Sequence, residues 1–224
     1  MNATTHYVIR GIACARVTHV IAQFRPSETV YPPSTAAADG TAMHAKIEAM
    51  LKGDTTTPFP LKSQVRFRTP AAADTHPAPQ VQACINTHIN PAEWRLDAAE
   101  RCVSDTAWRI AGTVDALFLH RTSGKRMLVD WKRTKGLWPE SAEIYQLQLN
   151  IYAAILARSA EPVDVMALAL FHPSNAAFKW VVVPAINVDL YTHNAHTLSP
   201  PPSSPPPSSA PPAIACLLVF NQQK

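Results

Sequence analysis

The sequence has no long apolar run, no paired cysteines and no acidic side chain before Glu28. A membrane-spanning helix needs ~20 predominantly apolar residues, whereas the apolar stretch from Ile214 to Phe220 is far shorter. The four cysteines are scattered, with no Cys-x-x-Cys pair. This spacing argues against a zinc finger or an iron–sulfur cluster and favours free thiols in a reducing compartment. We therefore expect an intracellular protein with no membrane span, in the nucleus, mitochondrion or cytoplasm.

Charged residues are also few, at 16% of 224 residues, but the hydrophobic fraction of 47% is that of a globular protein. Proline is abundant instead: 21 prolines stand against six glycines, and eight of them lie between Pro200 and Pro212. A Pro/Ser tract cannot build a core, so we expect a disordered tail there. A docking segment for a partner that binds proline-rich motifs is the alternative. The formal charge of +4 permits an anionic partner without requiring one.

The basic N-terminus allows two interpretations. Arg10, Arg16 and Arg25, without acidic neighbours, loosely resemble a transit peptide. The alternative is a short strand over residues 7–9 followed by a helix over residues 17–24.

The rest of the hydrophobic pattern indicates an α/β protein. Thr41 to Lys52 is rich in good helix formers, and Gly53 follows where a C-terminal cap would fall. Residues 54–91 are rich in Thr, Pro and Ala and are expected to be irregular. The remaining elements are expected as strands over 94–96, 108–119 and 126–132, a buried helix over 143–157, and strands over 163–171 and 179–183. This order suggests an α/β sandwich around one mixed sheet.

Two acidic residues, Asp115 and Asp130, lie within apolar sequence, where a charge is costly unless it is paired or bound to a metal. Because strand side chains alternate between faces, Asp130 and Lys132 project together, about 7 Å apart along the strand. A hairpin through Gly124 would bring Asp115 beside Asp130, where two carboxylates repel unless a cation lies between them. Hard oxygen ligands favour Mg²⁺ or Mn²⁺. The alternative is a turn aspartate and a solvated strand end.

Lys132 suggests chemistry beyond metal binding. A plain metal site has no use for a cation so close to its ligand, whereas a hydrolase must stabilise developing negative charge. Further basic residues nearby suggest either a phosphate-tracking surface or a solubilising loop; they are Arg121, Lys125, Arg126, Arg133 and Lys135.

Two pairs of polar residues have the i, i+4 spacing that places them on one helix face. His44 could bind a metal through a neutral imidazole nitrogen, with Glu48 supporting it; the alternative is an ordinary surface pair. Gln148 and Tyr152 lie in an otherwise apolar helix. They need hydrogen-bond partners if they are buried, and the alternative is that they point to solvent.

In their order along the chain, Gly112-x-x-Asp115, Asp130-x-Lys132 and Gln148-x-x-x-Tyr152 resemble the RecB-like branch of the PD-(D/E)XK nuclease superfamily. This branch includes lambda-type and mitochondrial genome maintenance exonucleases. The upstream Gly40-Thr41-x-x-His44 fits the histidine motif of the family, and Glu93-Trp94 resembles its acidic position ahead of the first core strand.

The resemblance covers about residues 7–185. The segment Val17 to Ile21 is similar to the N-terminal region of some members, which favours a strand and helix over a transit peptide. The implied fold is restriction-endonuclease-like, with helices flanking a central mixed β-sheet. The implied domains are an N-terminal strand/helix extension (1–35), a PD-(D/E)XK nuclease-like domain (36–188) and a disordered Pro/Ser-rich tail (189–224). Family members usually add a helix where this chain passes into Pro/Ser sequence.

The resemblance also implies roles for individual residues. The metal ligands would be His44, Asp115, Asp130 and the Trp131 backbone carbonyl, with Glu48 and Glu93 supporting them. Lys132 would position the attacking water or stabilise the pentavalent phosphate. Gln148 and Tyr152 would shape the site and contact the substrate, together with Arg133 and Lys135.

We therefore expect a nuclease that hydrolyses phosphodiester bonds of single- or double-stranded DNA with Mg²⁺ or Mn²⁺, as an exonuclease in replication, repair or recombination. The alternative is a catalytically inactive nuclease fold that binds nucleic acid or scaffolds a partner through the Pro-rich tail. The iron–sulfur cysteines of some relatives are absent, so no cluster is expected.

Overall fold

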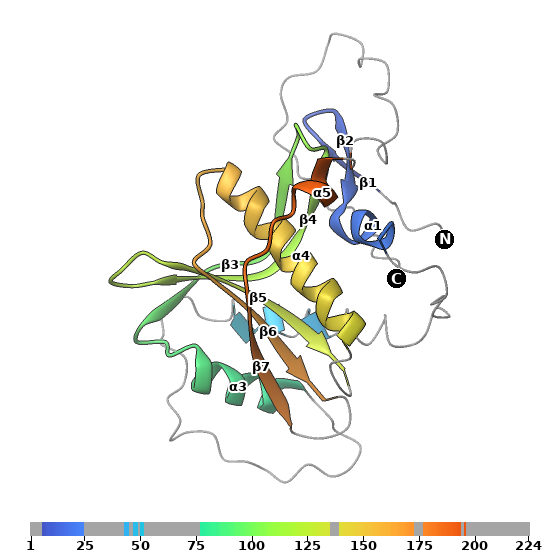
Figure 1. The fold of residues 1–224 in the computed structure, drawn as a ribbon. Coiled ribbons are helices and arrows are strands. Elements are labelled where there is room, and N and C mark those ends of the chain that lie inside the picture. Colours follow the sequence, from blue (N-terminus) through green and yellow to red (C-terminus); the bar gives the residue numbers. More distant parts are fainter. Residues whose placement is uncertain are drawn as a thin grey trace, which may run out of the picture.

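A seven-stranded mixed β-sheet forms the centre of the fold, and helices pack on both of its faces (Figure 1). The computed structural model describes residues 6–24, 43–44, 47–48, 50–51, 77–134, 139–172, 177–193 and 195. The strands are β1 (His6–Ile9), β2 (Ile12–Arg16), β3 (Trp94–Asp105), β4 (Ile110–His120), β5 (Arg126–Arg133), β6 (Val165–Phe171) and β7 (Phe178–Val183). The helices are α1 (Val17–Ala22), α3 (Pro77–His88), α4 (Pro139–Arg158) and α5 (Asp189–His193), and residues 43, 44, 47, 48, 50 and 51 are also helical. The expected mixed α/β architecture is confirmed.

Strand β4 has three neighbours in a sheet whose order is β1-β2-β4-β5-β6-β7, with β3 attached to β4. β3 runs antiparallel along the whole of β4. The other edge of β4 is shared between two strands. β2 pairs with it in parallel up to the Arg16–Ala111 pair, and β5 pairs antiparallel from the Ala116–Val129 pair onward. Among the described strands none pairs with this edge over residues 112–115, so the sheet forks there.

The strands place apolar side chains alternately on two layers, one on each face of the sheet. On one face, Leu117 and Leu128 belong to the core formed with α1 and α4. On the other, Phe118 and Val129 pack with α3 and with the helical residues around Met43. Figure 1 shows α4 crossing the first face while α3 lies on the second. The functional residues of β4 and β5 are therefore held between two packed layers.

The N-terminal segment is part of this sheet. β1 and β2 pair antiparallel, and the connecting Arg10 and Gly11 have φ values of 50° and 79°. Two successive positive φ angles are the signature of a type I′ hairpin turn. The strand near Tyr7 and the helix after Val17 are as predicted, whereas β2 was not predicted. The segment expected as an extension thus contributes two strands and α1 to the central domain.

Sequence reasoning was wrong about residues 77–88, which were expected to be irregular and form α3. Their prolines lie in the first turn, where a proline costs no helical hydrogen bond. Val81, Cys84 and Ile85 are buried at helical spacing against the sheet. This apolar spacing was the signal that the Pro/Ala-rich composition hid.

The first core strand is also much longer than the expected 94–96, because β3 continues to Asp105. Residues 97–105 are mostly charged, polar or small, so their composition gives little strand signal. They are held instead by pairing with β4 over its full length. Trp108, expected to start the next strand, lies in the turn, and its N–H donates to Asp105 Oδ1 at 2.8 Å.

The folded region continues beyond the boundary expected at residue 188. Helix α5 begins at Asp189, whose N–H donates to Asn187 Oδ1 at 2.8 Å, and Thr192 on α5 is buried. The Pro/Ser tract with its candidate docking segment, and the rest of the tail expected to be disordered, lie outside the described residues. None of the helices described here combines the length and apolar character of a membrane span.

We expect Gly112→Ala to lower the free energy of unfolding by about 1–3 kcal/mol, the usual effect of overpacking. A Cβ atom at residue 112 would lie 2.7 Å from the hydroxyl oxygen of Tyr152, whose side chain is only 4% exposed and has little room to move. Urea or thermal unfolding followed by circular dichroism measures the loss. An unchanged unfolding midpoint would contradict this close packing.

Candidate functional site

The candidate site lies at the fork of the sheet, where backbone pairing between β4 and β5 stops. The last pair joins Ala116 to Val129. Beyond it, Asp115 Oδ2 accepts a hydrogen bond of 2.8 Å from the Trp131 backbone N–H. The carboxylate thus takes the place that a strand carbonyl would occupy in a continued ladder. Asp115 is 8% exposed, so the sequence expectation of a buried, partnered acid holds.

His44 reaches this point from the helical segment on the face opposite α4. Met43 and Ile47 anchor that segment in the core. The Nε2 atom of His44 lies 3.0 Å from the Trp131 carbonyl oxygen, which can only accept, so Nε2 carries a proton and donates. The Nδ1 atom then faces two carboxylates, Asp115 Oδ1 at 3.4 Å and Glu100 Oε1 at 3.5 Å.

Glu100 is a site residue that sequence reasoning missed. It lies on β3 between the pairs Ala99–Ala116 and Arg101–Val114, so the register places it opposite Asp115. Its φ of 49° is in the left-handed region, which is uncommon for a residue other than glycine. Residues with such strained backbone conformations cluster at functional sites. Only the register of β3 identifies it, since its sequence neighbours are polar and charged like the rest of the strand.

Glu93, the acid that the sequence motif suggested, lies elsewhere. Its Oε1 accepts a hydrogen bond of 3.1 Å from Asn90 Nδ2, in the turn just before β3. Glu100 lies seven positions further along the chain, which is roughly 20 Å at the usual rise per residue in a strand. Glu48 is partly buried one helical turn from His44.

The three side chains His44, Glu100 and Asp115 can offer ligand atoms that all lie within 4.8 Å of one another. Mg²⁺ binds its ligands at about 2.0–2.1 Å, so two ligands on opposite sides of the ion lie about 4.2 Å apart. The three ligand atoms would need to move only slightly closer together to hold such an ion. The proton on Nε2 leaves the Nδ1 lone pair directed at the carboxylates, and a backbone carbonyl on the other ring nitrogen is the usual support of a metal-binding histidine. These residues therefore fit a hard divalent cation. The Trp131 carbonyl, expected as a ligand, contacts His44 instead.

The same two carboxylates perturb His44 in the metal-free protein. Burial acts to lower the pKa of His44, but the hydrogen bonds to Asp115 and Glu100 outweigh it and raise the pKa from 6.5 to about 10. Because the folded-state pKa is raised, this pairing stabilises the fold fully below pH 6.5, and the contribution is lost as the pH rises through about 10. A cation at this place would displace the imidazolium proton.

Asp130 and Lys132 project together from β5, as strand alternation predicted. Lys132 Nζ lies 2.6 Å from Asp130 Oδ2, and the ring centroid of Tyr145 on α4 lies 5.2 Å from the same nitrogen. Burial raises the pKa of Asp130, Lys132 opposes this and the Asp115 carboxylate adds to it. Burial acts to lower the pKa of Lys132, but Asp130 and Asp115 raise it. The site thus holds a partly buried ammonium group that pairs with the buried Asp130, and Asp130 lies outside the three-residue cluster.

Gln148 and Tyr152 cover the fork from α4. Both are at most 9% exposed, so the alternative that they point to solvent is wrong. Burial raises the pKa of the Tyr152 hydroxyl, and its hydrogen bond from Gln148 opposes this shift. The ring lies against Gly112, whose missing side chain allows the approach. The two residues therefore close the back of the site.

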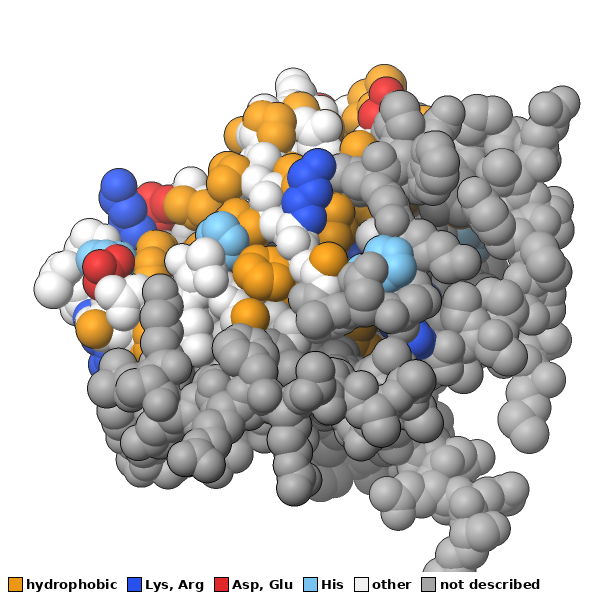
Figure 2. Space-filling view, turned by 90° about the horizontal axis from the view of Figure 1, so that it is seen from below, with side chains coloured by type: hydrophobic (Ala, Val, Ile, Leu, Met, Phe, Trp, Pro, Cys, Tyr) orange, Lys and Arg blue, Asp and Glu red, His pale blue; other side chains and the backbone are white. Residues whose placement is uncertain are grey.

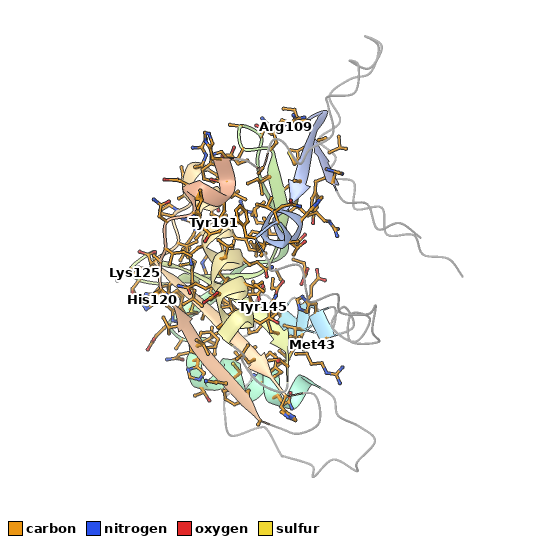
Figure 3. All side chains as sticks on the ribbon, turned by 45° about the vertical axis from the view of Figure 1, so that its right-hand side comes forward. Met43, Arg109, His120, Lys125, Tyr145 and Tyr191 are labelled. Atoms are coloured by element: carbon orange, nitrogen blue, oxygen red, sulfur yellow. The ribbon has the colours of Figure 1, made fainter. Side chains whose placement is uncertain are left out.

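The basic residues that are close in the sequence are separated in space. Arg121 and Lys125 lie in the β4–β5 hairpin, five or more residues beyond Asp115, which is roughly 17 Å or more. In Figure 3 Lys125 and His120 lie at one side of the molecule, away from Met43 and Tyr145. Arg133 is exposed at the end of β5. Lys135 lies outside the described residues, so a continuous basic surface is not supported.

No protein-family model matches the sequence, and no curated protein matches it significantly. Among solved structures, the crystal structure of SSO0001 is similar, with a TM-score of 0.41 and 14% sequence identity over 84% of this chain and 78% of that chain. A similarity of this size does not establish a shared fold or activity. The site is therefore interpreted from its own geometry.

We expect the imidazole of His44 to remain protonated at pH 8 in metal-free protein, because Asp115 and Glu100 raise its pKa to about 10. Side-chain NMR of the histidine ring across pH 5–10 measures this. Glu100→Gln should lower the pKa toward 6.5, whereas the control Glu93→Gln should leave it unchanged. A wild-type midpoint near 6.5 would refute the three-residue cluster.

Proposed function

We propose that the chain is a metal-dependent nuclease that hydrolyses phosphodiester bonds of DNA. One observation carries the proposal: His44, Glu100 and Asp115 converge at the fork of the sheet, next to the ion pair of the buried Asp130 with the partly buried Lys132. A bound cation and an ammonium group in adjacent positions are both suited to a phosphate anion. A purely structural metal site would have no use for the ammonium group.

A restriction-endonuclease-like fold is part of the proposal. Its support is the mixed sheet, with the two acids contributed by the adjacent antiparallel strands β4 and β5 and with α4 following directly. The positions of Gln148 and Tyr152 on α4, facing Gly112, agree with the motif order of RecB-like nucleases.

In this proposal each residue of the chain has a defined task. His44, Glu100 and Asp115 hold the ion, and the Trp131 backbone orients two of them through its N–H and its carbonyl. Lys132, held by Asp130 and Tyr145, donates hydrogen bonds to the attacking water or to a phosphate oxygen as negative charge develops.

The proposed ion is Mg²⁺ or Mn²⁺, because carboxylate oxygens and one imidazole are hard or borderline ligands. When bound, it supplies charge neutralisation of the phosphate and a more acidic water. Both carboxylates of the cluster and Asp130 repel a phosphate in its absence, so binding of the ion and of the substrate should be coupled.

We expect purified protein to degrade DNA only with a divalent metal, and Lys132→Gln and Asp130→Asn to lower the rate at least about 100-fold. Asp130→Asn keeps the side-chain volume, and Lys132→Gln retains a polar side chain in place of the ammonium group, since truncating one partner of an ion pair in the protein interior risks unfolding. Thermal melts check that both variants fold. End-labelled linear and circular, single- and double-stranded DNA then separate exonuclease from endonuclease cleavage. Full activity in either folded variant would sink this mechanism.

The ligand assignment has its own test. Glu100→Gln should weaken Mn²⁺ binding, measured by isothermal titration calorimetry, about 10-fold or more, because it removes one of two carboxylate ligands. Glu93→Gln removes an equal charge about 20 Å away and should change the dissociation constant less than about twofold. Equal affinities of these two variants for Mn²⁺ would remove Glu100 from the site.

A further inference from the structure

Arg16, the last residue of β2, is exposed and carries a charge that no described carboxylate neutralises. Its guanidinium carbon lies 5.3 Å from the centroid of the Tyr7 ring. Two other arginines of the described fold have acidic partners: Arg101 binds Glu161 and Arg158 binds Asp105. In the described part of the chain, Arg16 is held by an aromatic ring alone, which leaves its five N–H donors for a ligand.

Tyr7 links this arginine to the candidate site. Its hydroxyl lies 3.2 Å from Thr113 Oγ1. Thr113 precedes Asp115 by two residues on β4, so the two side chains leave the strand on the same face, about 7 Å apart. Contacts thus link Arg16 through Tyr7 to Thr113, two residues from the cluster, along the edge of β4 that has no partner among the described strands.

All these side chains lie on the face from which His44 approaches. Ala15 is buried in the core with α4, so its neighbour Arg16 points to the opposite face. Tyr7 pairs with Cys14 across the hairpin and shares that face. Of the described helices on this face, α3 packs against β6 and β7, at the other end of the sheet.

We propose that Arg16 and Tyr7 form a subsite for a backbone phosphate of a DNA strand, next to the phosphate bound at His44, Glu100 and Asp115. The subsite extends the proposed function to a second phosphate. It rests on that function for the direction in which the DNA strand crosses the fork. Arginine binds phosphate through a planar pair of donors, and stacking on a ring fixes that plane in advance. Arg16 is the phosphate-binding residue, and Tyr7 positions it.

Elsewhere on the molecule, the described residues offer less to such a strand. On the face seen in Figure 2, lysines and arginines are scattered singly among apolar and neutral side chains. Arg121 and Lys125 lie at the far end of the β4–β5 hairpin. The fork is where an exposed arginine, an open strand edge and the carboxylate cluster meet.

Binding of a fluorescein-labelled single-stranded DNA oligonucleotide is followed by anisotropy with Ca²⁺, a hard divalent ion that can neutralise the carboxylate cluster. Gel electrophoresis of the recovered oligonucleotide checks that it stays intact. Arg16→Gln should raise the dissociation constant about three- to tenfold and reduce the slope of log K against log salt by about 0.7, the value of one phosphate contact on a single strand. The matched control is Arg95→Gln, which removes an exposed arginine of β3 that is paired with Asp97. It should change neither quantity.

Tyr7 provides a second, graded test. Tyr7→Leu removes the ring and should weaken binding as Arg16→Gln does, while Tyr7→Phe keeps the ring and should stay within about twofold of wild type. Arg16→Lys keeps the charge without the planar fork and should retain the salt slope while losing part of the affinity.

The outcomes separate this subsite from the nuclease proposal. If Arg16→Gln weakens DNA binding but no metal supports cleavage, the subsite stands and the nuclease fails. If the wild type cleaves DNA and Arg16→Gln binds with the affinity and salt slope of Arg95→Gln, the nuclease stands and the subsite is overturned. A wild type that binds no DNA, or an Arg16 dependence found only with an RNA oligonucleotide of the same sequence, also overturns it.

Discussion

The structure depends on the interruption of one hydrogen-bond ladder. β4 gives one edge to β3 throughout, but its other edge passes from β2 to β5 with residues 112–115 between them. Backbone groups at such an interruption need partners, because a buried unpaired amide is costly. Asp115 supplies one partner, since its carboxylate binds the Trp131 N–H. This one hydrogen bond thus satisfies a backbone group at the interruption and also fixes the position of the Asp115 carboxylate in the site.

The charges around the fork form an interdependent set. Asp115 and Asp130 are nearly buried and would repel each other without cations nearby. Lys132 compensates Asp130, and the protonated His44 compensates Asp115 and Glu100. Removing any single member leaves an uncompensated charge in a poorly solvated place. When a divalent ion replaces the imidazolium proton of His44, the charges of Asp115 and Glu100 are still compensated. The side chains of the metal-free protein are therefore already positioned to bind a cation.

Much of this could be read from the sequence, where local spacing carried the information. Strand alternation placed Asp130 and Lys132 on one face, and i, i+4 spacing placed Gln148 with Tyr152. What the sequence could not give was register: Glu100 rather than Glu93 faces Asp115 because of long-range pairing between β3 and β4. The same limit hid β2, which is recognisable only once Arg10 and Gly11 form a turn, and Arg16, which looked like one more basic residue of the N-terminus.

The left-handed backbone of Glu100 has a consequence for how this chain can change. A left-handed conformation costs an ordinary residue about 1–2 kcal/mol relative to glycine, so glycine or asparagine would relax the strand at this position. The carboxylate therefore persists there at the expense of stability. Replacement of Glu100 by glycine would release this backbone cost, but it would also remove one of the two carboxylates that face His44, so the two effects on stability oppose each other.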